Sequence, residues 1–373
     1  MRDLRMRSRS PSLGAPALIS GNLMSSKMTG SNKGNRMLRQ IAIIGAGTMG
    51  TGIAVNAAMN GVSVILLDTS TQSLVRATPR MRKMLDRHCA KGRLSNQENN
   101  DSLARIAVTS KLETVRSAPL VIEAVYENFD VKTELLTRLG LICAEDAVIA
   151  TNTSALQVSA LAKVVRNPGR FLGMHYFSPA DSSPVVELIQ GDQTSAEAID
   201  CAKEFLVRTK RDILVCKDSP GFAINRFFVP FLNAAAQAVD AGLGTVGQIN
   251  ALGRELTGCP IGPFEVMNFI KPEIVLHAQC NLGALGDFYQ PAVGLARLVE
   301  KGEQWQIEDE PVRLEDAEKG RRALQRGILI PAVALREEGV AHPADIDRCA
   351  KSALKWANGP FSADWAETGE VSP

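Results

Sequence analysis

Long apolar runs and an excess of charge are both missing from this sequence. No apolar stretch approaches the roughly 18 to 20 consecutive residues that a bilayer-spanning helix needs. The 42 Lys and Arg residues nearly balance 40 Asp and Glu, leaving a formal net charge of +2. We therefore expect neither a membrane segment nor a nucleic-acid surface. At 373 residues, 45% of them hydrophobic and 22% charged, the chain has the composition of a soluble protein with room for two domains.

Paired cysteines are missing as well. The seven cysteines are scattered, odd in number and without a C-x-x-C pair. This pattern indicates reduced thiols of an intracellular protein, and neither disulfides nor a metal site is expected. The residues are Cys89, Cys143, Cys201, Cys216, Cys259, Cys280 and Cys349.

The first 36 residues are rich in Arg, Ser, Pro, Gly and Asn and poor in acids. We predict that residues 1–36 form a disordered extension of a cytoplasmic protein. A transit peptide is the competing interpretation, because such peptides are rich in Arg and Ser and poor in acids. Pro11 and Pro16 interrupt the amphipathic helix that this alternative requires.

Residues 41–68 contain a glycine motif between two apolar runs. Gly45, Gly47 and Gly50 stand in G-x-G-x-x-G register, after a β-branched run and before an Ala- and Met-rich segment. In such a motif the first glycine permits a tight turn, the second lets a pyrophosphate approach the backbone, and the third lets helix and strand pack closely. The order strand, glycine turn, helix, strand predicts a dinucleotide site.

The end of the second apolar run indicates which dinucleotide binds. Asp68 follows Gly45 by 23 residues (68 minus 45), where a carboxylate can accept hydrogen bonds from the adenosine ribose. It would repel a 2′-phosphate, so we expect NAD rather than NADP. Thr48 and Met49 complete the cofactor-binding loop at the start of the helix, where free N–H groups and the helix dipole favour phosphate.

Strands alternate with helices as far as residue 217. We expect strands over residues 41–44, 62–67, within 106–115, and over 120–124, 147–150, 171–174, 185–189 and 213–215, and helices over 72–90 and 130–142. Asp130 is the expected N-cap of the second helix, and residues 91–102 are expected to be a polar connection. Alternating elements predict an α/β fold, a Rossmann-type doubly wound sheet over residues 37–217.

Helical periodicity replaces the strand pattern from residue 218. The series Gly242, Ile249 and Gly262-Pro263-Phe264 recurs 97 residues later as Gly339, Ile346 and Gly359-Pro360-Phe361 (339 minus 242). A constant offset without gaps favours a duplicated helical unit. We therefore expect an all-α C-terminal part, with one helical domain over residues 218–310 and a shortened second copy over 311–373.

Polar residues that follow the predicted strands are candidates for catalysis, because ligands bind at the carboxyl ends of parallel strands. His175, Ser154 and Glu127 each follow such a strand. Glu187 lies twelve residues after His175 (187 minus 175), so a hairpin could bring the two together. Alternatively, His175 is a core histidine and Glu187 a surface acid.

Alcohol dehydrogenation needs a base for the hydroxyl proton while hydride leaves the same carbon. A histidine whose other ring nitrogen binds a carboxylate meets this need. Ser154 either donates to a substrate oxygen or caps a nearby helix. Asn225 starts the first long helix after the boundary, where it either faces the cleft or forms an ordinary interdomain hydrogen bond.

These pieces together resemble the NAD-dependent L-3-hydroxyacyl-CoA dehydrogenases. The matching motifs are IAIIGAGTMGTGIA, VIEAVYEN, ATNTSAL, GMHYFSPA with VVELI, DSPGFAINR and IGPFE, in the family's order over residues 41–265. The HYFSP form and the shortened second unit look like the dehydrogenase part of bacterial multifunctional fatty-acid oxidation enzymes.

The resemblance implies oxidation of (S)-3-hydroxyacyl-CoA to 3-oxoacyl-CoA, with an acyl-CoA thioester as substrate. It implies a catalytic pair, His175 and Glu187, with Ser154 and Asn225 holding the substrate. It further implies that certain other residues contact ligands: Glu127, Lys132 and Asn152 would lie near NAD, and Lys91 near the CoA phosphates. The family usually dimerises through its helical domain, which the second unit could mimic within one chain.

Three departures from the family pattern concern packing and substrate preference: Asn268, Lys271 and Pro184. Two other functions remain open at this point. One is a dehydrogenase of free hydroxy acids, although that group uses a lysine where Asn225 stands. The other is a non-catalytic NAD-binding protein.

Overall fold

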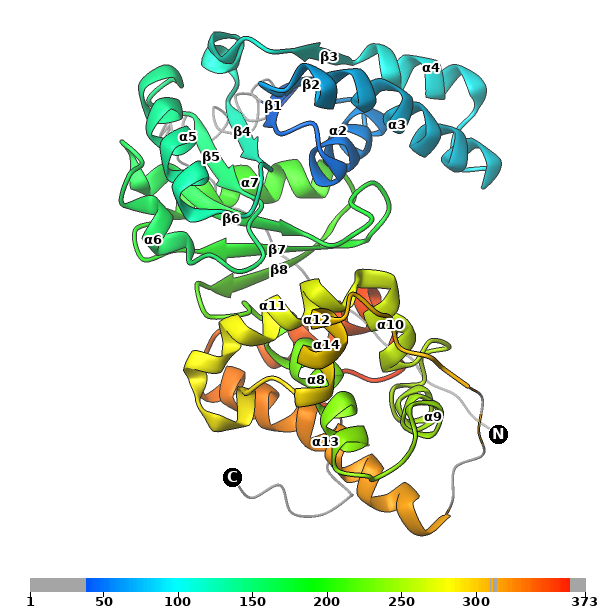
Figure 1. The fold of residues 1–373 in the computed structure, drawn as a ribbon. Helices are drawn as coiled ribbons and strands as arrows, with labels where there is room; N and C mark the ends of the chain where they lie inside the picture. The colour runs from blue at the N-terminus through cyan, green and yellow to red at the C-terminus, as the bar shows by residue number, and fades with distance from the viewer. Residues whose placement is uncertain (1–37, 309, 311–313, 363–373) are drawn as a thin grey trace, which may run out of the picture.

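The computed structural model describes residues 38–308, 310 and 314–362. The expected extension over residues 1–36 lies outside the described residues, as do parts of the expected second copy at 311–313 and 363–373. Figure 1 shows two bodies joined end to end, a sheet with helices around it and an all-helical body. In the described part of the chain, no helix combines the length and apolarity needed to cross a membrane.

One eight-stranded sheet forms the first body, in the order β3-β2-β1-β4-β5-β6-β7-β8. All neighbouring strands pair in parallel except β6 and β7, which are antiparallel. The strands are β1 Gln40–Ile44, β2 Ser63–Leu67, β3 Ile106–Thr109, β4 Leu120–Glu123, β5 Val148–Thr151, β6 Phe171–Tyr176, β7 Val185–Gln190 and β8 Asp212–Lys217. The predicted doubly wound fold is confirmed.

Helices cover both faces of this sheet. Ile41 and Ile43 of β1 pack in one core with α2, α3 and α7, whereas Ala42 and Ile44 belong to a second core with α5 and α6. Burial on both faces explains why the strands are apolar runs rather than alternating sequences. The helices are α2 Thr48–Met59, α3 Thr71–Ala90, α4 Asn96–Ala104, α5 Phe129–Ile142, α6 Val158–Ala162 and α7 Ala196–Arg208, with 3-10 turns η1 Leu112–Ser117 and η2 Pro168–Arg170.

Two local expectations in this domain were wrong. The polar connection contains α4, a helix with little apolar periodicity whose start is fixed by a reciprocal Ser95 and Glu98 capping box. The N-cap of α5 is Asn128, whose side chain accepts from the Val131 N–H at 3.0 Å, and not Asp130, which lies inside the first turn.

The second body is built around α8. This helix packs against α9, α11, α12 and α13, and its residues Phe227, Phe228 and Phe231 surround Trp356 with ring centroids 5.4–6.2 Å apart. The helices are α8 Asn225–Asp240, α9 Val246–Thr257, α10 Pro263–Ile270, α11 Pro272–Leu282, α12 Val293–Glu300, α13 Leu314–Glu337 and α14 Pro343–Leu354, with turns η3 Gly283–Leu285 and η4 Asp287–Tyr289.

The 97-residue sequence offset also appears in the geometry. The chain turns through left-handed backbone at Gly242 (φ 68°) and at Gly339 (φ 60°). The Phe264 N–H is bound by the Asn250 side chain at 3.0 Å, and 97 residues later the Phe361 N–H is bound by Asp347 at 2.8 Å. These matched positions support a duplicated unit.

One departure from the family pattern has a structural role. Asn268 exchanges two hydrogen bonds with the backbone of Trp305, at 2.8 and 3.0 Å, and so fixes the segment after α12 against α10. The side chain therefore serves packing.

Candidate active site

The glycine turn leads from β1 into α2. A Cβ on Gly45 (φ 108°) would lie 2.3 Å from the Ala124 carbonyl oxygen, and one on Gly50 would lie 1.8 Å from the Gly45 oxygen. Both glycines are therefore required by the packing of the protein itself. Gly47 differs, since no described atom lies within 4 Å of the position of its missing Cβ. The space above Gly47 is where a phosphate could approach the backbone.

A cavity of about 610 Å³ opens beside this turn, lined by Gly47, Thr48, Met49 and Asp68 among others. Helix α2 starts there without a side-chain cap, so its first N–H groups point to the cavity without internal partners. The Asp68 carboxylate is fixed by the N–H groups of Ala46 and Ser70, both at 2.8 Å. An open cradle for phosphate with a fixed carboxylate alongside fits NAD.

The hairpin of β6 and β7 brings His175 and Glu187 together. His175 lies within β6 rather than after it, and it stands directly opposite Glu187 in the antiparallel register. Its Nδ1 lies 2.6 Å from Glu187 Oε2, and both side chains are almost fully buried. Because a carboxylate only accepts, Nδ1 carries the proton and Nε2 holds the lone pair of the neutral ring. Packing against Phe177 and Phe222 fixes the ring plane.

The second oxygen of Glu187 connects the two bodies of the molecule. Its Oε1 accepts the N–H groups of Ala223 and Ile224, at 3.0 and 2.7 Å, immediately before α8. Both oxygens of this buried carboxylate are thus engaged, Oε2 with the imidazole and Oε1 with the backbone before α8.

Glu127 fixes the loop that carries Ser154. One of its oxygens accepts the Thr153 hydroxyl at 2.5 Å and the N–H groups of Ser154 and Ala155 at 2.8 and 3.1 Å. The other lies 3.3 Å from Lys132 Nζ. Burial raises the pKa of Glu127, but the Lys132 charge and these hydrogen bonds outweigh it and hold the pKa below its usual value.

Lys132 is the buried cation behind this loop. Its side chain is completely buried, and its Nζ lies 2.6 Å from Glu123 as well as near Glu127. It thus anchors the two acids behind the site, and its place near NAD stays a prediction. Sequence reasoning missed Glu123, although an acid inside the apolar β4 was the signal, because a charge there requires a buried partner.

The other predicted residues keep polar groups available. Ser154 is exposed and does not cap α6, which begins four residues later, and its hydroxyl has no hydrogen bond to the described residues. The half-buried Asn225 amide is likewise without a described partner. Asn152 uses its Oδ1 to hold the Tyr176 N–H at 2.9 Å, next to His175, and its amide nitrogen stays available.

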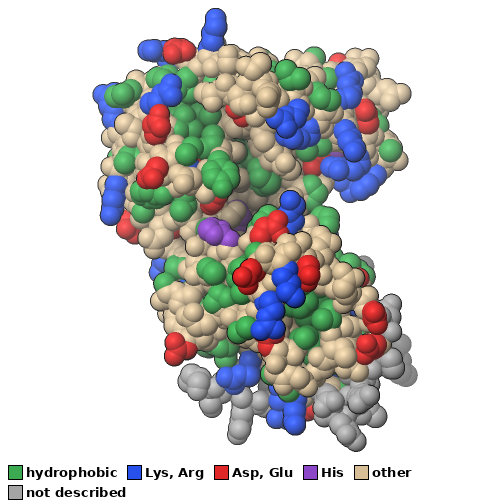
Figure 2. Space-filling model, in the orientation of Figure 1, with side chains coloured by type: hydrophobic (Ala, Val, Ile, Leu, Met, Phe, Trp, Pro, Cys, Tyr) green, Lys and Arg blue, Asp and Glu red, His purple; other side chains and the backbone are tan. Residues whose placement is uncertain are grey.

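Lys91 lies apart from these residues. It is exposed at the C-terminal end of α3, beside the exposed Arg87 and Arg93. Figure 2 shows Lys and Arg side chains gathered where the end of α3 overhangs the helical body. Lys91 therefore lies on the surface at the end of α3, where it follows Arg87 and precedes Arg93 in the chain.

A dinucleotide cradle on a doubly wound sheet, with a carboxylate-bound histidine at the carboxyl end of the same sheet, defines a nicotinamide-dependent dehydrogenase. Comparison with known proteins then identifies the family. The family model described as 3-hydroxyacyl-CoA dehydrogenase, NAD binding domain, matches residues 40–219. The model described as the C-terminal domain of that enzyme matches residues 221–311.

Comparisons with individual proteins support the same family. The chain is 31% identical to the 3-hydroxybutyryl-CoA dehydrogenase of Bradyrhizobium diazoefficiens, over 71% of this chain and 92% of that relative. It is also 31% identical to the 3-hydroxyadipyl-CoA dehydrogenase of Escherichia coli K12, where the match covers 71% of this chain and 55% of the relative. The crystal structure of 3-hydroxybutyryl-CoA dehydrogenase from Escherichia coli K12 has the same fold, with a TM-score of 0.80 at 23% identity over 88% of this chain and 92% of that one.

The chain belongs to the 3-hydroxyacyl-CoA dehydrogenase family. It is accordingly an oxidoreductase that uses NAD, and its reaction class is the oxidation of 3-hydroxyacyl-CoA in fatty-acid metabolism. The resemblance based on the sequence motifs is confirmed.

Proposed function

We propose that this enzyme reversibly oxidises (S)-3-hydroxyacyl-CoA, with His175 as the general base and Glu187 as the carboxylate that orients it. The observation that carries this proposal is the buried pair, in which Nδ1 is bound at 2.6 Å and Nε2 remains available. A general base must reach the substrate with a free lone pair, and only Nε2 has one in this arrangement.

The proton and the hydride leave the substrate separately. Nε2 of His175 takes the hydroxyl proton, and the negative charge of Glu187 stabilises the imidazolium that results. NAD, when held in the cradle, would supply the acceptor for the hydride that leaves the carbon carrying the hydroxyl. In the reverse direction, Nε2 returns its proton to the carbonyl oxygen.

Ser154 and Asn225 are the residues we assign to the substrate. Each offers a hydrogen-bond donor without a described partner, and Glu127 fixes the backbone of Ser154 through its N–H. A donor held in place before the substrate arrives stabilises the charge that develops on the reacting oxygen. Ser154 would donate to that oxygen, and Asn225 would hold the group next to the reacting carbon.

The cofactor is assigned to the cradle at Gly47. The N–H groups of Thr48 and Met49 would bind the pyrophosphate, and Asp68 would accept from the ribose. The Asn152 amide would donate to the nicotinamide half, while Glu127 and Lys132 position the neighbouring loop. Gly45, which also lines the cavity, and Gly50 shape the turn that presents these N–H groups.

The exposed end of α3 is proposed to meet the CoA phosphates through Lys91. Phosphate groups favour clustered Lys and Arg side chains, and Arg87 and Arg93 lie close by in the chain. The half-exposed Arg87 is partly engaged by Asp181 at 2.6 Å, so Lys91 and Arg93 have the greater freedom to bind.

We further propose a homodimer through the helical domain, with a monomer as the alternative if the second helical unit takes the place that a partner would have. Sedimentation velocity distinguishes the two. A cytoplasmic location is proposed, with an organelle as the alternative if residues 1–36 direct import; fractionation of cells that make the full chain tests it.

NADH oxidation at 340 nm is the decisive assay for this proposal, with acetoacetyl-CoA and a longer 3-oxoacyl-CoA as substrates. We expect turnover with NADH, far slower turnover with NADPH because of Asp68, and none with free acetoacetate. Demonstrated NADH binding without turnover of either thioester would contradict the proposal and favour a non-catalytic role. Turnover of the free acid instead would favour a hydroxy-acid dehydrogenase.

A further inference from the structure

A buried arginine follows Asn225 in the first turn of α8. Arg226 is 2% exposed, and its guanidinium donates to Ser219 Oγ at 3.0 Å, to the Pro220 carbonyl at 3.3 Å and to the Tyr289 hydroxyl at 3.4 Å. It also lies over the Tyr289 ring, 5.6 Å from the centroid. A buried guanidinium keeps its charge, so it requires a counter-charge.

The second helical unit supplies that counter-charge. Glu338, at the end of α13, accepts from Arg226 Nη2 at 2.6 Å and is half exposed. It is the carboxylate paired with Arg226 among the described residues. The pair connects two segments that are 112 residues apart in the chain.

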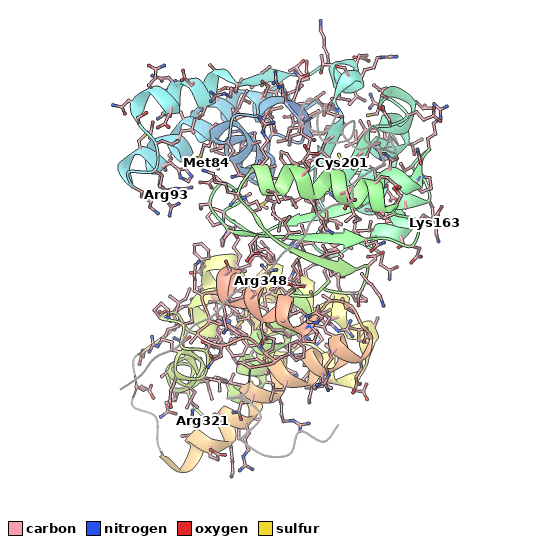
Figure 3. The ribbon with its side chains drawn as sticks, turned by 180° about the vertical axis from the view of Figure 1, so that it is seen from behind. Met84, Arg93, Lys163, Cys201, Arg321 and Arg348 are labelled. Atoms are coloured by element: carbon pink, nitrogen blue, oxygen red, sulfur yellow. The ribbon has the colours of Figure 1, made fainter. Side chains whose placement is uncertain are left out.

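The segment containing Glu338 is itself fixed to the sheet. The Lys217 N–H donates to the Val340 carbonyl at 2.8 Å, where β8 ends. Helix α14 follows, and its Arg348 pairs with Asp212 and donates to the Ile213 carbonyl at 3.1 Å. Figure 3 shows Arg348 at the junction of the two bodies.

Arg226 in turn holds the linker before α8, and this linker has an unfavourable backbone. Gly221 and Phe222 both have positive φ angles, 74° and 50°, and such a conformation is costly for phenylalanine. Surrounding contacts must therefore maintain it. The linker's Ala223 and Ile224 N–H groups are the donors that fix Glu187.

We propose that Glu338 is a positioning residue for catalysis, acting through Arg226 and the linker over residues 219–224 on Glu187 and hence on His175. This inference rests on the proposed roles of His175 and Glu187. The second helical unit thereby contributes a side chain that the catalytic pair depends on, although it contacts neither substrate nor cofactor.

The test compares Glu338→Ala and Glu338→Gln with Glu337→Ala, a matched control that removes a neighbouring exposed acid. We expect Glu338→Ala to lower kcat with acetoacetyl-CoA and NADH about tenfold, because a misplaced base slows the chemical step. KM for NADH should stay within twofold, since the cofactor cradle is remote from the linker. Glu338→Gln, which keeps an acceptor oxygen but removes the counter-charge, should give a kcat between those of Glu338→Ala and the wild type, and Glu337→Ala should match the wild type.

Amide hydrogen exchange provides a readout that does not depend on activity. In Glu338→Ala we expect the Ala223 and Ile224 amides to exchange at least tenfold faster than in Glu337→Ala. Equal kcat and equal exchange in these two variants would overturn the proposal, as would a lower melting temperature with unchanged kcat at 25 °C. If the wild type has no turnover, the proposed function fails, and the exchange result still decides whether Glu338 holds the linker.

Discussion

Glu187 and Glu127 make the same two kinds of contact. Each uses one oxygen to accept two successive backbone N–H groups of a loop, Ala223 and Ile224 for Glu187 and Ser154 and Ala155 for Glu127. Each places its other oxygen beside a basic side chain, at 2.6 Å from His175 and 3.3 Å from Lys132.

The partner residue makes the difference between the two acids. His175 keeps its second ring nitrogen, Nε2, free of the bond to Glu187, whereas Lys132 is fully buried between two acids. Under the proposed function, the same carboxylate arrangement orients a proton-transferring base in one case and positions a loop in the other. Which of the two sites can transfer a proton therefore depends on the base and its accessibility, and not on the acid.

His175→Gln should produce the largest effect. The amide retains approximate shape but cannot take a proton, so we expect kcat to fall between about a hundred- and ten-thousandfold. Steady-state NADH oxidation measures this, and NADH fluorescence titration should give an unchanged Kd. Turnover within a factor of ten of the wild type would show that the two acids do not differ as described.

Lys132→Met should act mainly on stability. It leaves the buried Glu123 and the partly exposed Glu127 without their cation, and breaking a buried pair such as Lys132–Glu123 typically costs roughly 3 to 5 kcal/mol. Urea unfolding measures the loss, with Lys163→Met as the control because Lys163 is exposed in the same domain. An equal loss in the two variants would argue against a buried Lys132 network.

Asp181 extends the comparison of Glu187 and Glu127. Among the described residues, its buried carboxylate accepts hydrogen bonds from side chains and from no backbone N–H group. It binds His88 at 2.9 Å and Arg87 at 2.6 Å, which fixes the loop between β6 and β7. Burial raises the pKa of Asp181, but the hydrogen bonds and charges of His88 and Arg87 outweigh it and lower the pKa below the ordinary 3.8. Its stabilisation is thus present above about pH 4 and is lost as the pH falls through the folded-state value.

The Asp181→Asn variant should therefore be less stable at pH 7 by about 1 to 3 kcal/mol, the usual cost of losing a charged hydrogen bond. The difference in melting temperature from the wild type should narrow as the pH falls below 4. Asp192→Asn, at an exposed site, is the control. A difference that stays constant from pH 7 to pH 3 would contradict the assignment.

Ser154→Ala is expected to have the smallest effect. Its N–H remains bound to Glu127, so only the hydroxyl is lost, and we expect kcat/KM for acetoacetyl-CoA to fall about tenfold. A melting temperature within about 2 °C of the wild type, the shift that the ~0.5 kcal/mol scale of surface substitutions allows, would separate this loss from misfolding. An unchanged kcat/KM would remove Ser154 from the substrate site.

Local patterns predicted most of the sheet and the cofactor turn. The strands and Gly45, Gly47 and Gly50 were predictable because each depends on residues close in sequence. The two errors, at the N-cap of α5 and at α4, also concern residues close in sequence, where the local pattern fits more than one structure. Asn128 and Asp130 both suit an N-cap, and α4 lacks the apolar periodicity that identifies a helix.

The candidate site was predictable only in part. The hairpin spacing indicated that His175 and Glu187 could meet, and the structure brings them together at 2.6 Å. Nothing local indicates that Glu187 also binds the linker, or that Arg226 finds its counter-charge 112 residues away. Such pairs depend on how the two bodies pack, which sequence periodicity does not encode.

The aromatic cluster on α8 has a consequence for how the protein is made. Phe231 leaves the ribosome 125 residues before Trp356 (356 minus 231), the ring that covers it. At a synthesis rate of about 5 to 20 residues per second, the nascent chain spends roughly 6 to 25 s with this aromatic face uncovered. During that interval the growing chain is a natural client for a ribosome-associated chaperone, and truncations that end before Trp356 should aggregate.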